Sequence, residues 1–347
     1  MALSQLPLAL VILSLAPRPL PAQVDQFLVV PNVHSDSSQT QIHDGAQRGY
    51  HIVLVAPHGD VVLLERNPEG SGLYSYRFLS CPNLWKVGDC DGFLNHNASS
   101  GYRVLPDATD ASVLKNVTVP QGFGSRLVME KPPQAALYSY HVQDLASDKV
   151  IPEAYAPVGL MFEGASSRLV LSERPRDGAS PLSSTPYLIV GPDSSKKLIQ
   201  TLNSLGAKGH RLALLAPTAR FGGPLYALVY FFGNPKSWEY ALLTANDSAE
   251  NLQRHLNEQG AKGFRPVIVA AGNLILERST QGDPQPYSYC VLSIGKDRPF
   301  SAEIEKQLAA GYQLRLLVPL NLRPAKAFSF GDISYASSPA VILKKRE

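Results

Sequence analysis

Residues 238–278 read WEYALLTANDSAENLQRHLNEQGAKGFRPVIVAAGNLILER, and this stretch decides the fold. Its first six residues alternate and are rich in aromatic and aliphatic side chains, a pattern that predicts a strand. Leu252 and Leu256 lie four residues apart, which predicts the apolar face of a helix. Asp247 followed three residues later by Glu250 is typical of a capping box, so we expect this helix to begin there.

Glycines and a second apolar pattern complete the unit. We expect Gly260 and Gly263 to end the helix, because glycine readily takes the left-handed conformation of a C-terminal cap. Residues 264–270 and 274–278 then predict two more strands, joined by a turn. The unit is therefore strand, helix, strand, strand.

The same plan recurs along the chain. The landmark glycines that enter the second strand of each unit are separated by 52, 108, 54 and 48 residues. The interval of 108 residues is two steps long, so it predicts a further unit and a total of about six. These landmarks are Gly49, Gly101, Gly209, Gly263 and Gly311.

The inserted unit has recognisable first and last strands. Tyr-Ser-Tyr opens three units, at 74–76, 138–140 and 287–289, and the second of these begins the inserted unit. The middle of that unit holds Pro152 and Pro157 and lacks a helical apolar pattern. We therefore expect its helix to be degraded or missing.

The unit at 238–278 resembles a small bacterial domain of unknown function. That family opens with a Tyr/Trp-x-Tyr strand, has a helix ending in Leu-Asn-x-x-Gly-Ala-x-Gly before an aromatic residue, and closes with a strand ending in Lys or Arg. The resemblance implies a βαββ fold and carries no activity. The matching residues are Trp238, Tyr240, Leu256, Asn257, Gly260, Ala261, Gly263, Phe264 and Arg278.

These patterns predict an α+β protein of about six tandem βαββ repeats. Each repeat would form an antiparallel sheet with its helix on one face. The stretch around 179–183 is rich in Gly, Ser and Pro and is the most linker-like part of the chain. We therefore expect two lobes of three repeats each, at 23–178 and 184–347.

The N-terminal residues 1–22 are predicted to be a signal peptide. Residues 8–16 are apolar over the length of a signal-peptide core, and three prolines follow before Ala22. The competing interpretation is a short buried strand or helix. Cleavage near Ala22 would export the chain to the periplasm or the medium, and we expect no transmembrane segment in the mature protein, because no other apolar stretch is long enough.

Composition excludes several classes of protein. The chain of 347 residues is 44% apolar and 18% charged, which excludes a disordered chain and a coiled coil. Lys and Arg total 32 against 29 Asp and Glu, a net charge of +3 with no concentrated basic face. We therefore expect no nucleic-acid partner.

Three cysteines are present. Cys81 and Cys90 are close enough in sequence for a disulfide between a strand end and the following loop, and export would permit it. Cys290 lies in a strand-like run, where a small buried hydrophobe is the expected role. The alternative, a catalytic cysteine, would require a histidine partner that no pattern identifies.

Other candidate sites are incomplete. The run Asp89-Cys90-Asp91-Gly92 suggests a metal loop but lacks the ligands of an EF-hand, so an ordinary polar loop is expected. Glu-Arg pairs close several repeats, at 65–66, 173–174 and 277–278, and we expect them to end strands at the surface. No cofactor is predicted, and nothing in the sequence indicates an oligomeric state.

The leading hypothesis is an exported, non-catalytic scaffold that binds a protein or envelope partner. Its long insertions, 106–125 and 319–339, are the expected interaction surfaces, because long ordered loops often carry function. One alternative is a hydrolase with a site between the lobes, using His58 or His96 with nearby carboxylates. A second alternative is a structural component of an envelope assembly.

Overall fold

The computed structural model describes most of the chain. The described residues are 25–31, 35–56, 61–68, 71–81, 87–105, 125–144, 156–163, 167–176, 187–217, 225–231, 237–244, 248–270, 272–294, 300–320 and 338–346. The predicted signal peptide at 1–22, the linker at 179–183 and most of both insertions lie outside them.

The described elements form six consecutive groups, called units 1 to 6. Unit 1 contains β1 (Phe27–Pro31), α1 (Asp36–Gln47), β2 (Tyr50–Val55) and β3 (Val61–Arg66). Unit 2 contains β4 (Ser75–Cys81), α2 (Val87–Ala98), β5 (Arg103–Val104) and β6 (Ser125–Lys131). Unit 3 contains β7 (Tyr138–Asp144), β8 (Ala156–Glu163) and β9 (Ser167–Pro175). The stretch expected to have lost its helix, 145–155, lies outside the described residues.

The second half of the chain supplies three further units. Unit 4 contains β10 (Tyr187–Asp193), α3 (Ser195–Gly206), β11 (His210–Pro217) and β12 (Leu225–Phe231). Unit 5 contains β13 (Trp238–Thr244), α4 (Ala249–Gly260), β14 (Arg265–Ala270) and β15 (Asn273–Ser279). Unit 6 contains β16 (Tyr287–Ser293), α5 (Phe300–Ala309), β17 (Gln313–Leu320) and β18 (Ser338–Arg346). The protein is therefore of mixed α+β class, with more sheet than helix.

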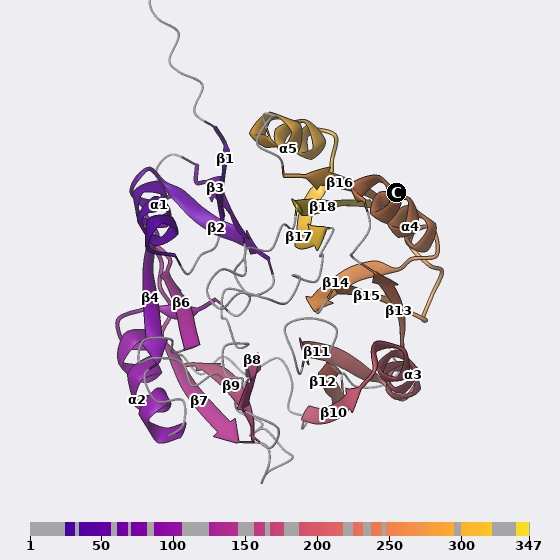
Figure 1. Ribbon diagram of the computed structural model, residues 1–347, viewed down its shortest axis with the longest axis horizontal. Helices are drawn as coiled ribbons and strands as arrows, with labels where there is room; N and C mark the ends of the chain where they lie inside the picture. The colour runs from indigo at the N-terminus through magenta and orange to yellow at the C-terminus, as the bar shows by residue number, and fades with distance from the viewer. Residues whose placement is uncertain are drawn as a thin grey trace, which may run out of the picture.

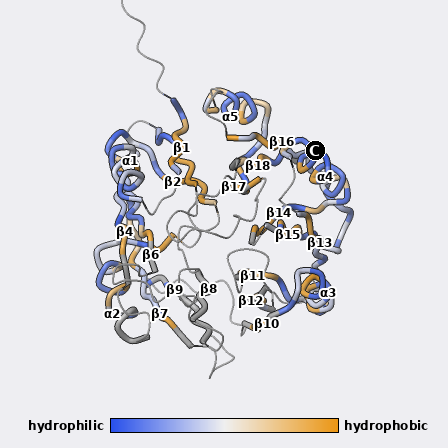
Figure 2. The backbone as a smooth tube through the Cα atoms, viewed as in Figure 1, coloured by the Kyte–Doolittle hydropathy of each residue, from blue (hydrophilic) through white to orange (hydrophobic). Residues whose placement is uncertain are grey.

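Each unit forms a three-stranded antiparallel sheet with its last strand in the middle, as in the order β13-β15-β14. The middle strand has neighbours on both sides, so it suits a continuous apolar run. Leu274, Ile275 and Leu276 of β15 are fully buried. Figure 2 shows hydrophobic residues concentrated in the strands, whereas the helices mix hydrophobic and hydrophilic positions.

The sheets are covered on both faces, not on one as expected. Alternate residues of a strand point to opposite faces, and those of β15 lie in two different cores. Leu274 and Leu276 pack with Leu256 of α4, whereas Ile275 packs with Leu202 of α3 in the preceding unit. Helices α3 and α4 each lie between the sheet of their own unit and the sheet of the next unit. The main cores therefore lie between units.

The six units form a ring with the described helices on its outer rim (Figure 1). The last unit closes on the first: Ile304 and Leu343 share a core with Leu63, and the Phe27 backbone N–H donates to Ser301 Oγ at 3.1 Å. On the opposite side of the ring, β8 contacts β11. The two halves of the chain therefore meet at both ends.

Helix α4 begins one residue later than the capping box predicts. Its N-cap is Ser248, whose Oγ accepts a hydrogen bond from the Asn251 backbone N–H at 3.2 Å. Asp247 itself lies outside the described residues. Helices α1 and α3 also have serine N-caps, Ser35 and Ser194. A serine before each of these helices therefore satisfies one of the free N–H groups there.

The two glycines expected to end the helix have different roles. Gly263 has φ +82° and makes the left-handed turn into β14. Gly260 is still helical, and a Cβ at this position would lie 2.2 Å from the Tyr287 carbonyl oxygen of the next unit. Gly206 approaches Trp238 in the same way. These helical glycines permit close contact between units rather than capping.

Candidate functional site

The structure places the five landmark glycines at equivalent positions. Each follows a helix and enters the second strand of its unit, and their φ values lie between +82° and +89°. Only glycine adopts this conformation without strain. They are structural residues, and the residues around them form the contacts between units.

The cysteines are on three different elements. Cys81 ends β4, and Cys90 lies in the first turn of α2 rather than in a loop; the side chains of both are outside the described part. Cys290 lies on β16, carries a free thiol and packs at the edge of the core between units 6 and 1. Burial raises the pKa of this thiol, as expected for a structural hydrophobe rather than a nucleophile.

The polar run around Asp91 is helical, which corrects its interpretation as a loop. Asp91 Oδ1 accepts a hydrogen bond from the Val142 backbone N–H at 2.6 Å, and its Oδ2 lies 2.9 Å from His141 Nδ1. Asp91 therefore links units 2 and 3. Among the described residues, no group of three or more His, Cys, Asp or Glu side chains is placed to hold a metal.

The structure describes only one of the two histidines considered for catalysis, His96. His96 lies exposed in the last turn of α2, and this helix is on the outer rim of the ring (Figure 1). His58 lies outside the described residues. The hydrolase hypothesis stays a prediction.

The most regular polar arrangement is the joint, meaning the contact between one unit and the next. Its first component is a helix asparagine. Asn203 Oδ1 accepts from the Tyr240 backbone N–H at 2.6 Å, and its amide donates to the Tyr240 carbonyl at 3.1 Å. Asn257 pairs with Tyr289 in the same way, at 2.7 and 3.3 Å. These tyrosines lie on edge strands, so the side-chain amide takes the place of a neighbouring strand.

The second component is the hydroxyl of that tyrosine. Tyr240 Oη accepts a hydrogen bond from the Leu212 backbone N–H of the preceding unit at 2.8 Å. Tyr140 does the same with Val104, also at 2.8 Å, and donates to Glu173. Burial raises the pKa of both phenols, so they keep their protons.

The third component is an arginine–glutamate pair across the joint. Arg211 of unit 4 contacts Glu277 of unit 5 at 2.6 Å, and Arg103 of unit 2 contacts Glu173 of unit 3 at 2.5 Å. Arg211 also lies over the Trp238 ring, 4.4 Å from its centroid. The Arg211–Glu277 pair is largely buried, and removing one partner of a buried pair costs about 3–5 kcal/mol, whereas Arg103 is 49% exposed and its pair with Glu173 contributes less.

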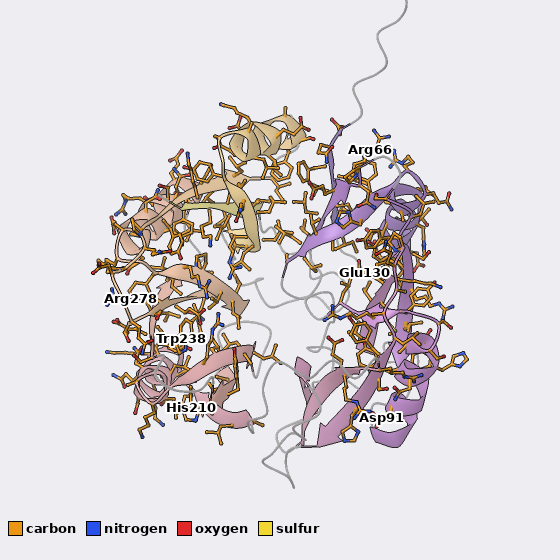
Figure 3. The ribbon with its side chains drawn as sticks, turned by 180° about the vertical axis from the view of Figure 1, so that it is seen from behind. Arg66, Asp91, Glu130, His210, Trp238 and Arg278 are labelled. Carbon is orange, nitrogen blue, oxygen red and sulfur yellow. The ribbon has the colours of Figure 1, made fainter. Side chains whose placement is uncertain are left out.

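The Glu-Arg pairs are therefore not simply surface strand ends. Glu277 and Glu173 are 1% and 4% exposed, because they face the joint and accept the arginine of the preceding unit. Of the arginines that follow the glutamates, Arg66 and Arg278 lie toward the outside of the ring (Figure 3).

The joint between units 1 and 2 departs from this pattern. His51 occupies the position of the arginine and stacks on Tyr74, with ring centroids 4.8 Å apart. Tyr76 Oη still accepts from the Ile52 N–H and lies 3.3 Å from Glu130. Burial raises the pKa of the Glu130 carboxyl and lowers that of His51.

The joint between units 5 and 6 departs further. Pro266 stands where the other joints have a backbone N–H donor, so Tyr289 Oη donates instead to the Phe264 carbonyl at 2.8 Å. The register pairs Tyr289 with Lys344, as Tyr240 pairs with Glu277. A cation thus occupies the position of the glutamate at this joint.

The sequence identified the aromatic residues that begin the units and the landmark glycines. It did not show that both groups lie at the contacts between units. The arginines of the joint stand two residues after the landmark glycines, as Arg103 after Gly101 and Arg211 after Gly209. Aligning the repeats on those glycines would have revealed them. The partner glutamates are 66 or 70 residues away, so no local pattern joins the two.

Comparisons with known proteins add no relative: no family model, curated protein or solved structure matches the chain. The resemblance to a small bacterial domain therefore stays a prediction. None of the helices in the described ranges is both long and apolar enough to cross a membrane.

Proposed function

We propose that this protein is an exported, non-catalytic scaffold that binds a protein or envelope partner. Ring closure is the observation that carries the proposal. Because unit 6 packs on unit 1 through Ile304 and Leu63, each unit is held by a neighbour on both sides, and the paired second and third strands that lead into the insertions belong to this closed frame. A rigid frame of this kind lowers the entropic cost of presenting loops to a partner.

The polar residues of the joints favour a scaffold over an enzyme. Asn203, Asn257 and the buried Glu277 bond to neighbouring units. Groups engaged in this way stabilise the frame. We also propose that the six units descend from one βαββ repeat, because an arginine recurs two residues after the landmark glycine in units 2, 4 and 5 and each unit has the same strand order.

The two long insertions are the proposed contact surface. Their described bases are paired strand ends: β5 and β6 pair at Arg103 and Glu130, and β17 and β18 pair through Leu320 and Ser338. Both insertions therefore extend hairpins of the ring, and β17, like β2 and β14, runs from the rim toward its middle (Figure 1). The joint residues named above lie outside both insertions, so shortening the insertions removes none of them.

The test compares the full chain with a variant in which 107–123 and 322–336 are replaced by short Asn-Gly turns. Both are used as bait for solubilised envelope, and the bound proteins are identified and quantified. We expect a stoichiometric partner on the full chain and its loss from the variant, with unchanged circular dichroism. A variant with three residues inserted at the exposed turn around Gly282 is the matched control and should keep the partner. Equal capture by the full chain and the shortened variant would refute the insertions as the contact surface. Absence of a stoichiometric partner would refute the proposal that the protein is a scaffold.

A further inference from the structure

The joint between units 5 and 6 gathers positive charge from neighbouring strands. Arg211, Arg265 and Arg315 lie on β11, β14 and β17, and each of these strands contacts the next. Glu277 Oε1 accepts from both Arg211, at 2.6 Å, and Arg265, at 2.8 Å. One carboxylate therefore serves two guanidinium groups.

Arg315 adds a third guanidinium next to them. It occupies a β-bulge of β17, between Leu314 and Leu316, where units 1, 4 and 5 have aliphatic residues. Its Nε donates to the Pro266 carbonyl of unit 5 at 3.0 Å. Burial and the nearby Arg265 charge lower the pKa of Arg315, so the positive charges at this joint repel one another.

Arg265 and Arg315 can each donate more hydrogen bonds than they make to the described residues. A guanidinium has five N–H donors. Within the described residues, Arg265 uses Nη2 toward Glu277 and Arg315 uses Nε toward Pro266. The Arg265 side chain is 30% exposed, so solvent and small solutes reach it.

At the joint between units 4 and 5, a carboxylate of the later unit neutralises the arginine of the earlier one. The corresponding position in unit 6 is Lys344, whose ammonium lies 4.7 Å from the Tyr287 ring centroid. The carboxylate of the regular joint is thus replaced by a cation, whereas the arginine, Arg265, is kept.

We propose that the joint between units 5 and 6 binds a small oxyanion, held by Arg265 and Arg315 in place of the missing glutamate carboxylate. Guanidinium groups pair with carboxylate and phosphate oxygens through parallel charge-assisted hydrogen bonds. The ligand is a carboxylate- or phosphate-bearing small molecule, or such a group on the scaffold's partner. None of these residues belongs to the insertions, so the variants below test this site without changing the proposed contact surface.

The experiment uses the full chain and measures binding of inorganic phosphate by equilibrium dialysis and of acetate by isothermal titration calorimetry. Sodium chloride keeps the ionic strength constant. We expect saturable binding of at least one probe, and the stronger of the two identifies the preferred group. Arg315→Gln should weaken binding at least about tenfold, through the loss of a charge-assisted bond. Lys344→Glu restores the regular joint and should abolish binding.

Lys345→Glu is the control, because it makes the same change of charge at the adjacent, exposed position and should retain binding. Circular dichroism establishes that each variant is folded. If Lys344→Glu does not fold, Arg315→Gln decides the outcome. The proposal is overturned if neither probe binds the wild-type protein saturably, or if Arg315→Gln binds as tightly as Lys345→Glu.

Discussion

Replacing Gly260 by alanine tests the close packing between units. An alanine Cβ there would lie 2.2 Å from the Tyr287 carbonyl oxygen and 2.7 Å from a ring carbon of Tyr289. Ordinary contact begins at 3.4 Å, so α4 would have to move by roughly 1 Å, the shortfall between these distances, and overpacking of this kind costs about 1–3 kcal/mol. The higher helix propensity of alanine offsets about 1 kcal/mol of this cost.

Gly92 provides a matched control. It is also a helical glycine, in α2, but it is exposed and nothing lies within 4 Å of the position that an alanine Cβ would take. Gly92→Ala should therefore stabilise the protein by about 0.5–1 kcal/mol, whereas Gly260→Ala should destabilise it by up to about 2 kcal/mol, the overpacking cost less the gain in helix propensity. Gly206→Ala should behave like Gly260→Ala, because its Cβ would meet the Trp238 carbonyl oxygen at 2.2 Å.

Urea unfolding followed by far-ultraviolet circular dichroism measures both effects, with the slope of each transition compared as well as its midpoint. The two variants should differ by about 0.5–3 kcal/mol in the free energy of unfolding, the sum of the loss and the gain above. If Gly260→Ala and Gly92→Ala are equally stable, the helices do not pack against the next unit as described, and the account of the joints is wrong.

Three other predictions concern the joints and the N-terminus. Asn257→Leu removes both bonds to the Tyr289 backbone and should cost about 1–3 kcal/mol in urea unfolding, whereas the exposed Glu258→Gln should change little; equal effects would contradict the role of the asparagine. The pKa of Glu130 in the folded protein lies above its ordinary value of 4.5, so the folded protein binds this proton more tightly than the unfolded chain does. As pH rises from about 4.5 through the folded pKa, ionisation of Glu130 therefore lowers the free energy of unfolding. Relative to wild type, Glu130→Gln should therefore gain stability over that pH range, whereas Glu258→Gln should follow the wild-type profile; a Glu130→Gln profile parallel to wild type would refute the raised pKa. Intact-mass analysis of the exported protein should find cleavage after Ala22, and retention of residues 1–22 would refute the signal peptide.

Local patterns in the sequence were enough to locate individual elements. The spacing of Leu252 and Leu256 placed a helix where α4 lies, and Gly263 marked the turn that follows it. These features depend on residues a few positions apart, so a single sequence reveals them. The start of the helix was misplaced because Asp247 and Ser248 are adjacent and either side chain can cap.

Contacts between units were much harder to predict. Glu277 looked like a surface residue because Arg278 follows it, yet its bonding partner Arg211 lies 66 residues earlier. Coverage of both sheet faces was also missed, although the unbroken apolar run in β15 is typical of a strand buried on both sides. Closure of the ring depends on the rotation between successive units, which side-chain packing sets and hydrophobic periodicity does not encode.

Contact between unit 6 and unit 1 has a consequence for how the protein opens. In an open array of repeats, a terminal unit has one neighbour and detaches when a single interface breaks. Here unit 1 is held by α5 of unit 6 as well as by its contacts with unit 2, so releasing it requires two interfaces to break together. Partial unfolding from the ends of the described chain is thereby suppressed, and we expect amide hydrogens of β3 and β18 to exchange as slowly as those of β15.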